Sequence, residues 1–384
     1  MVIYPLVLLI CILTFTLTIN NSQNRIPVRV LFITLILFTG LTFTNGWDWY
    51  GYKDFYENIQ SSGFSGVKDY NEYGIEYLYL VYMYIIGLTG LGFGFFIFIN
   101  AFIVNLFIYK FSKRTAINYG LFMLLFISVS YLRLELSTIR QGLAVAIIFY
   151  AYSLMLCERN KKALLFIVVA ICFHRSAAIV LLFLPFIKYV NKKEIHYFIV
   201  LLALPFIFLS DYINNFFITL LSYANHGFLS VYVFKIMLYL SMSNVAQVNP
   251  QAIMLIFLYL ICIYYCDLKD KKQLFFLNVM ACQVVISLYF TFLTQLIIMR
   301  MVYYFQVGWI CWVIFLYKEY CKPKWVCFIL ICFLVATKLM LNFRYEYDRA
   351  VFFPYYNVIF SFTDDDYGRS RDYILNKVNE IPQG

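Results

Sequence analysis

Charged residues are scarce in this sequence. Asp, Glu, Lys and Arg make up only 13% of its 384 residues, whereas 63% are hydrophobic and 21% are aromatic. A soluble domain has about 25% charged residues. Long apolar runs recur from one end of the sequence to the other. The composition therefore excludes a soluble enzyme and predicts an all-α, polytopic bundle of transmembrane helices.

Residues that bind metals or form catalytic sets are also few. The three histidines and ten cysteines show no ligand spacing for zinc, and no Ser/His/Asp set is legible. The stretch GLGFG has neither the preceding strand nor the following Lys-Ser/Thr of a nucleotide-binding loop. The cysteines lie in apolar runs or near predicted cytoplasmic ends, which implies no disulfide framework. We therefore expect no metal and no cofactor.

The net charge of +10 is concentrated in the short gaps between apolar runs. This placement is typical of the cytoplasmic side of a membrane protein, so we expect no nucleic-acid partner. One path of the chain puts every basic cluster on that side. The clusters are Arg25/Arg29, Lys110/Lys113/Arg114, Arg159/Lys161/Lys162, Lys188/Lys192/Lys193, Lys269/Lys271/Lys272 and Lys318/Lys322/Lys324.

This path has about ten spans in a single domain over residues 1–341. The first run lacks a basic start and a cleavage site, so we expect a retained span and not a signal peptide. Residues 76–109 are too long for one helix, which predicts a short re-entrant piece and then a full span. Single crossings are expected near 2–18, 30–44, 115–131, 136–156, 196–210, 251–266, 274–296, 302–317 and 325–341.

Three segments are expected on the outer side of the membrane. They are the loop 45–75, the segment 211–250 and a polar tail over 342–384. The second of these contains FLSVYVFKIMLYL, with Lys235 among apolar residues. We interpret that stretch as an interfacial amphipathic helix, because an added span would move the later lysines outside.

The apolar run from 163 to 187 is interrupted by the motif FHRS. Each half has about 11 residues, and at 1.5 Å per residue neither half crosses about 30 Å of hydrocarbon. Two half-helices fit this length, and irregular backbone at membrane depth is tolerated only where it is buried or lines a cavity. The break therefore predicts a site at His174 and Arg175, with a buried, hydrogen-bonded histidine as the alternative.

Arginine and lysine are distributed unevenly along this path. Lysine dominates the cytoplasmic clusters, whereas arginine outnumbers lysine elsewhere. The planar guanidinium grips phosphate or carboxylate through two parallel hydrogen bonds, which a topology signal does not require. Arg140, Arg175 and Arg300 each lie at the outer end or break of an apolar run, with no acid within four residues. They predict an anionic ligand outside; ion pairs with acids such as Glu135 and Asp348 are the alternative.

The first outer loop, GWDWYGYKDFYEN, places Asp48 between Trp47 and Trp49, with Tyr50 next. Aromatic faces stack on the C–H surfaces of sugars and carboxylates accept from hydroxyls, so the pattern suits a sugar site. An aromatic belt at the membrane interface is the alternative for the rings. Tyr303 extends the sugar interpretation to the late motif IIMRMVYYFQ.

Glu76 is the last outer acid before an apolar run. A general base and a helix N-terminal carboxylate stabilised by the helix dipole are both open for it. Asp48 and His174 are the other candidates for a base.

The order of these motifs resembles the EpsG family of bacterial polysaccharide polymerases, which is related in role to Wzy-type O-antigen polymerases. The motifs are GWDWY, the Glu76 helix start, IRQGLAVAI, FHRSAAIVLLFLP and a late R…YY. The resemblance covers about 45–304, and RQ…A and HRSA are its most specific parts. The first loop departs from the family, because Trp47 separates Gly46 from Asp48 where the family has a Gly-Asp pair.

The resemblance implies a metal-independent glycosyltransferase of the bacterial inner membrane, with its active site facing the periplasm. Its donor is a growing glycan on undecaprenyl diphosphate, and its acceptor is a new lipid-linked repeat unit. A chain-length regulator protein is an expected partner. A flippase for the same lipid-linked sugars and an O-antigen ligase-like transferase are the alternatives; the absence of two similar halves favours the polymerase.

On this reading the arginines neutralise the departing lipid diphosphate, and Gln141 adds a neutral hydrogen bond. The acceptor hydroxyl needs a base, which contributes about 10²–10⁴ in rate. Asp48, Glu76 and His174 remain open for that role.

Overall fold

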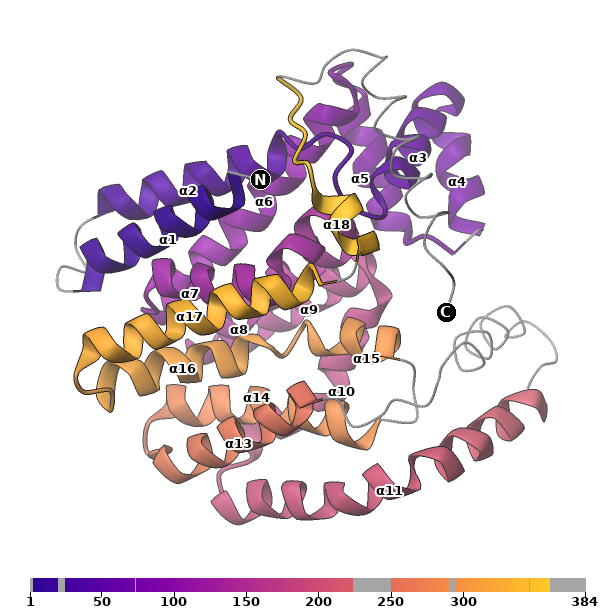
Figure 1. Ribbon diagram of the computed structural model, residues 1–384. Coiled ribbons are helices and arrows are strands. Elements are labelled where there is room, and N and C mark those ends of the chain that lie inside the picture. Colours follow the sequence, from indigo (N-terminus) through magenta and orange to yellow (C-terminus); the bar gives the residue numbers. More distant parts are fainter. Residues whose placement is uncertain are drawn as a thin grey trace. The chain divides into compact units, whose positions relative to one another are not determined.

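The computed structural model describes residues 3–19, 25–72, 74–223, 250–290, 295–344 and 346–359. These residues form helices, and the isolated bridge between Thr42 and Asn357 is their only β-type pairing. The all-α class is thus confirmed for this part of the chain. Two compact units divide it, Met1–Ala177 with Leu316–Gly384 and Ala178–Phe315 (Figure 1). We describe each unit by itself, and the predicted single domain over 1–341 stays a prediction.

The first unit is built around α8 (Ile139–Leu156). The helices α6 (Gly92–Thr115) and α9 (Asn160–Phe173) pack on α8, and α2 (Arg25–Gly40) packs on α6. Small residues permit the closest contacts: a Cβ at Gly120 would lie 2.6 Å from the Phe15 nitrogen of α1. The other helices of this unit are α1 (Ile3–Ile19), α3 (Trp49–Ser62), α4 (Phe64–Glu72), α5 (Tyr77–Gly87), α7 (Tyr119–Phe126), α17 (Lys324–Asn342) and α18 (Glu346–Phe352).

The second unit centres on α14 (Lys271–Tyr289). The side chain of Asp270 caps this helix, accepting from the Lys272 and Gln273 amides at 2.8 and 3.3 Å. Asn278 of α14 donates to the carbonyls of Ile187 and Val190 at the end of α10, at 3.0 and 2.8 Å. The helices of this unit besides α14 are α10 (Ile179–Tyr189), α11 (Lys193–Tyr223), α13 (Pro250–Tyr265), α15 (Gln295–Val302) and most of α16 (Val307–Glu319).

Four of the described helices, α6, α8, α14 and α17, are long and apolar enough to cross a membrane. Protein buries 78% of the apolar stretch of α8 but only 6% of that of α17. Phe333 and Leu330 of α17 are 65% and 55% exposed, which suits contact with lipid and not with water. The chain is a helical membrane protein, and the count of about ten spans stays a prediction.

Several predicted boundaries are wrong. The helix that starts as α7 continues through two π-helical stretches, η1 (Ile127–Tyr131) and η2 (Arg133–Ser137), where the sequence predicted a gap. The helix α11 does not end near 210 but runs to Tyr223, so the predicted outer segment begins as helix. The predicted span over 302–317 starts later, at Val307, and the separate short helix α15 precedes it.

The predicted outer loop 45–75 contains two helices, α3 and α4. Trp49, Tyr52, Tyr56 and Ile59 recur at helical spacing and form the buried face of α3. That face packs against α5 and α6, which explains why aromatic residues here fold into a helix. The short α5 followed by the full-length α6 confirms the two-part reading of residues 76–109.

The break predicted at FHRS is confirmed. The helix α9 ends at Phe173, His174 is extended, and a single 3-10 turn, η3 (Arg175–Ala178), leads into α10. The two helices have 14 and 11 residues. Neither helix is long enough to cross the hydrocarbon alone.

The predicted polar tail begins with ordered structure, because residues 346–352 form α18. After α18, the chain pairs with the loop that follows α2: the Phe43 amide donates to Tyr356 (3.1 Å) and the Val358 amide to Leu41 (2.8 Å). Backbone donors and acceptors on both segments are thereby satisfied. The proposed interfacial helix around Lys235 and the tail beyond residue 359 lie outside the described residues.

The predicted basic clusters of the first unit lie at one end of it. Tyr150 of α8 contacts Arg114 at the end of α6 and Phe166 near the start of α9. Tyr109 of α6 contacts Phe32 near the start of α2. Helix ends that carry the clusters at 25–29, 110–114 and 159–162 therefore share one end, which we call the basic end. The start of α8 lies at the opposite end, which we call the site end.

Candidate anion-binding site

Glu76 lies in the loop before α5, and its carboxylate is nearly buried, with 9% of the side chain exposed. The apolar residues that follow it form α5 and fix its position. Its side chain makes no capping hydrogen bond to its own helix. The carboxylate instead accepts from residues far away in the sequence, while the N-cap position of Glu76 before α5 agrees with the alternative of a helix N-terminal carboxylate.

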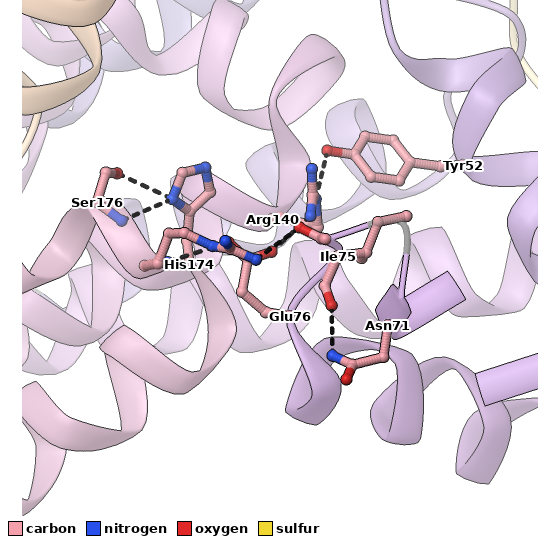
Figure 2. A network of polar contacts seen from close by, with 9 residues as sticks. Tyr52, Asn71, Ile75, Glu76, Arg140, His174 and Ser176 are labelled. Carbon is pink, nitrogen blue, oxygen red and sulfur yellow. Dashed lines mark hydrogen bonds and ion pairs between the residues drawn. The ribbon is translucent and has the colours of Figure 1, made fainter. Parts of the chain in front are cut away.

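Arg140 lies in the first turn of α8 and reaches this carboxylate. Its Nη1 donates to Glu76 Oε2 at 2.5 Å, and its Nε donates to the Tyr52 hydroxyl at 3.1 Å (Figure 2). The ring centres of Tyr52 and Tyr79 lie 5.7 and 5.9 Å from the guanidinium carbon, close enough for cation–π attraction. Its Nη2 makes no hydrogen bond to a described residue, so one edge of the fork is available to a ligand.

Arg175 reaches the same carboxylate from the break after α9. Its backbone amide donates to Glu76 Oε1 at 3.1 Å, and its Nε lies 3.5 Å from that oxygen. Its Nη2 donates to the Gly74 carbonyl at 2.6 Å, in the loop just before Glu76. Nearly half of the Arg175 side chain, 47%, is exposed. Two arginines 35 positions apart in the sequence therefore converge on a single acid.

This 2:1 arrangement carries a net positive charge. Burial alone would raise the Glu76 pKa, but the attraction of Arg140 and the hydrogen bond from the Arg175 amide outweigh it, so the pKa lies below its ordinary value. Glu76 is a stable anion here, which makes it a weak proton acceptor. The cluster retains one guanidinium charge that Glu76 does not balance, and an anionic ligand would balance it.

His174 occupies the break beside this cluster. The Ser176 amide donates to its Nδ1 at 3.3 Å, and the Ser176 hydroxyl lies 2.8 Å from the same atom (Figure 2). A backbone N–H can only donate, so Nδ1 accepts and a neutral ring carries its proton on Nε2. This tautomer suits His174 as a donor to an anion better than as a base.

The loop with Asp48 is held against the start of α8. Gly46 has φ +102°, and a Cβ there would lie 1.7 Å from the Leu136 carbonyl oxygen, so only glycine fits. The Trp47 amide donates to the Ser137 hydroxyl at 3.1 Å. The exposed Asp48 directly precedes α3, the helix that carries Tyr52. Asp48 therefore belongs to the same end of the first unit as Arg140.

The predicted sugar-binding rings have different environments. Trp49 is 4% exposed and packs against Phe43, Tyr50 and Phe93, so its ring has no face open for a sugar. This corrects its predicted role, because the helical spacing of α3 places it in the core. Trp47 is 43% exposed and Tyr50 is partly exposed, so both keep surface for a ligand.

The remaining predicted residues are not in this cluster. Gln141 is fully buried and follows Arg140 by about 100° around α8, so it points away from Glu76. Arg300 and Tyr303 belong to the second unit. Arg300 lies in the last turn of α15 and does not open a span, and Tyr303 is 8% exposed in the following turn. The convergence of Arg300 with the other two arginines stays a prediction.

A second ion pair lies at the site end. Arg133 Nη2 is 3.5 Å from Asp348 Oδ2 of α18. The alternative of ion pairs with acids is therefore observed for Arg140 and Arg175 with Glu76, and Arg133 adds a further example. Glu135 is 4% exposed and has no ion pair with a described base. Burial raises the pKa of Glu135 well above its ordinary value, which favours the neutral acid.

Tyr52, Tyr79 and Ser176 are site residues to which the sequence assigned no role. The helical spacing in α3 and the position of Tyr79 three residues after Glu76 were the available signals, but each partner comes from a distant segment. Within the described ranges, no group of three His, Cys, Asp or Glu side chains is placed to hold a metal ion.

Apolar helices, an irregular break and two arginines on one carboxylate define a helical membrane protein with a cluster of cationic side chains. A family model described as the EpsG family matches residues 25–357, so the chain belongs to that family. EpsG proteins are Wzy-like polysaccharide polymerases, which places this chain in that general class. No curated protein and no solved structure matched the chain.

Proposed function

We propose that this protein polymerises lipid-diphosphate-linked oligosaccharide repeat units at the outer face of the bacterial inner membrane. The donor is a growing glycan on undecaprenyl diphosphate, and the product is a surface polysaccharide such as O-antigen. The observation that carries this proposal is the convergence of Arg140 and Arg175 on Glu76. A lipid diphosphate is the anion that such a polymerase must bind and release.

In the proposed reaction, a hydroxyl oxygen of the acceptor sugar bonds to the anomeric carbon of the donor. The bond from that carbon to the diphosphate oxygen breaks, and the diphosphate keeps the electron pair. Negative charge therefore develops on the leaving group. The Nη2 edge of Arg140 and the exposed guanidinium of Arg175 are the groups that stabilise this charge.

Glu76 has a positioning role in this scheme. It holds both guanidiniums in place before the ligand arrives, so the site is organised at little cost when the diphosphate binds. Its backbone loop is fixed in turn by the Arg175 bond to Gly74. A phosphate group has enough acceptor oxygens to bind the outward edges of the two forks while Glu76 keeps the inner ones.

The acceptor hydroxyl must lose a proton. Glu76 is a weak base because the Arg140 charge and the backbone amide of Arg175 lower its pKa, and the Nδ1 of His174 already accepts from Ser176. Asp48 is exposed at the same end of the first unit. We therefore assign Asp48 as the base and His174 as a hydrogen-bond donor to the diphosphate.

The test compares two arginines at the same end of the first unit. Arg140→Ala should lower polymerisation by about 10²–10³-fold, and Arg140→Lys should fail as well because the fork is lost. The matched control is Arg133→Ala, which breaks the pair with Asp348 and leaves the Glu76 cluster intact. The measurement is the chain-length ladder of lipid-linked glycan on a gel, with the amount of membrane-inserted protein as reference. Long chains from Arg140→Ala would overturn the proposal.

A deletion strain separates the polymerase from the other readings. Single repeats that reach the outer surface support the polymerase. Repeats trapped inside would indicate a flippase, and long chains still attached to undecaprenyl diphosphate would indicate a ligase.

A further inference from the structure

The basic end of the first unit has a hollow of about 370 Å³ that the polymerase proposal does not use. Lys110, Lys113, Arg114 and Tyr150 line it. The three cations belong to the last turns of α6, and Tyr150 belongs to α8. No ion pair joins any of the three to a carboxylate of a described residue. Like charges that gather around one hollow without an acid repel each other, and an anion would relieve that repulsion.

Arg114 has a polar atom that the described structure leaves without a partner. Its Nη1 is buried and makes no hydrogen bond. Its guanidinium carbon lies 4.9 Å from the ring centre of Tyr150, which holds the side chain at the hollow. A buried, unpaired donor of a charged group is costly, so this atom indicates a missing acceptor.

Capping of α6 does not account for these cations. The Ser112 carbonyl accepts from the Ile117 amide at 3.2 Å, and the Phe111 carbonyl accepts from the Thr115 hydroxyl at 2.8 Å. Ala116 adopts the left-handed conformation that ends the helix. The carbonyls of the last turn thus have partners without Arg114, although the helix dipole still favours positive charge there.

An apolar surface adjoins the hollow. Tyr150 contacts Phe107 and Phe166, with ring centres 5.3 and 5.0 Å apart. Leu164 and Leu165, near the start of α9, are 46% and 60% exposed. Cations beside half-buried aromatic and exposed aliphatic side chains suit a molecule with an anionic head and a hydrocarbon chain.

We propose that this hollow binds the phosphate headgroup of an anionic membrane lipid. A phosphodiester oxygen accepts from the Arg114 guanidinium, Lys110 and Lys113 neutralise the remaining charge, and the acyl chains follow the apolar surface of α9. Lipid phosphate and free phosphate share this chemistry, and the adjoining apolar surface selects the lipid. The site is independent of the Glu76 cluster, so its failure would leave the polymerase proposal untouched.

The test uses the full chain in nanodiscs of phosphatidylcholine, with and without phosphatidylglycerol. Native mass spectrometry counts the phosphatidylglycerol molecules that stay bound after release. We expect Arg114→Gln to weaken retention about tenfold, and the double change of the exposed Lys110 and Lys113 to Ala to weaken it similarly. The matched control is Lys324→Ala, which removes an exposed cation at the N-terminus of α17. Phe328 in the first turns of α17 contacts Phe15 near the end of α1, so Lys324 also lies at the basic end.

Each outcome decides the proposal. Loss of retention in the hollow variants with wild-type retention in Lys324→Ala supports it, and the lysine pair serves if Arg114→Gln does not fold. Equal retention in all variants would overturn it. A third arm adds inorganic phosphate to nanodiscs of phosphatidylcholine alone and measures thermal stability. A phosphate effect that requires Arg114, without retained phosphatidylglycerol, would assign the hollow to a soluble anion and overturn the lipid assignment.

Discussion

Glu76 and Asp348 are both nearly buried acids, with 9% and 8% of their side chains exposed, and both bind arginine at the site end of the first unit. Asp348 pairs with Arg133 at 3.5 Å, whereas Glu76 binds Arg140 at 2.5 Å and receives both the amide and the guanidinium of Arg175. The pair at Asp348 joins one arginine to one acid and fastens α18 to η2. The cluster at Glu76 has more cation than anion and lies at an irregular break. The difference separates an ion pair that serves the fold from a cluster that we propose binds a ligand.

The largest change in the free energy of unfolding should come from replacing each of the two acids separately. Glu76→Gln leaves two arginines without a carboxylate. Breaking a buried pair costs about 3–5 kcal/mol, and the partial exposure of both arginines lowers this to about 2 kcal/mol. Asp348→Asn should cost about 1 kcal/mol, because Asp348 has one ion pair, its N···O distance is 3.5 Å, and the Arg133 side chain is partly exposed. Thermal unfolding of the purified protein measures both, and an equal or larger loss for Asp348→Asn would contradict the comparison.

A smaller loss of stability and of polymer length should follow from removing a single hydroxyl group beside Arg140. Tyr52→Phe removes the acceptor of the Nε bond and keeps the ring, so it should cost about 0.5–1.5 kcal/mol and shorten the polymer by misorienting the fork. The matched control is Tyr79→Phe, because the Tyr79 hydroxyl is buried without a hydrogen bond while its ring also faces Arg140. Chain-length ladders and unfolding temperatures measure the pair. Identical behaviour of the two variants would remove the role of the Tyr52 hydroxyl.

The smallest effect should be on the pH dependence of stability. The Glu76 pKa is lower in the folded protein than its ordinary value of 4.5, so the folded state binds the proton more weakly than the unfolded state. The stabilisation is therefore complete above the ordinary pKa and is lost as the pH falls through the lowered one. The difference in unfolding temperature between wild type and Glu76→Gln should be constant above about pH 5 and shrink below it. A difference that grows on acidification would show that the sign is wrong.

The sequence predicted individual site residues better than their partners. Glu76, Arg140 and His174 were found because charge or a helix break interrupts an apolar run, and the hydrocarbon thickness gives such an interruption a meaning. The sequence predicted that Arg140 and Arg175 act on one ligand, but it did not predict the contact of Arg140 with Glu76, because the two are 64 positions apart and nothing local in the sequence encodes that contact. The absence of an acid within four residues of these arginines suggested that they had no ion-pair partner, but Glu76 pairs with both Arg140 and Arg175 from a distant segment.

The fold shows the same division. The length of each apolar run, together with an interrupting motif, predicted the break at His174 and the short α5 before α6. The helices α3 and α4 were missed because Trp49 and its neighbours were interpreted through their surface chemistry, whereas their spacing of three or four residues places them in a core. The π-helical stretches η1 and η2 have no composition signal, so the predicted end of that helix at residue 131 was wrong.

The pairing of residues 353–358 with the loop after α2 matters for anyone who handles this protein. The Asn45 side-chain nitrogen donates to the carbonyls of Phe352 and Pro354. The segment just before Asp48 is therefore hydrogen-bonded to residues more than 300 positions later. Truncating the chain before residue 346 would remove these hydrogen bonds next to the Asp48 loop. A reporter protein fused after residue 359 preserves these hydrogen bonds. Its attachment point lies at the site end, so one fusion reports which side of the membrane the site end faces.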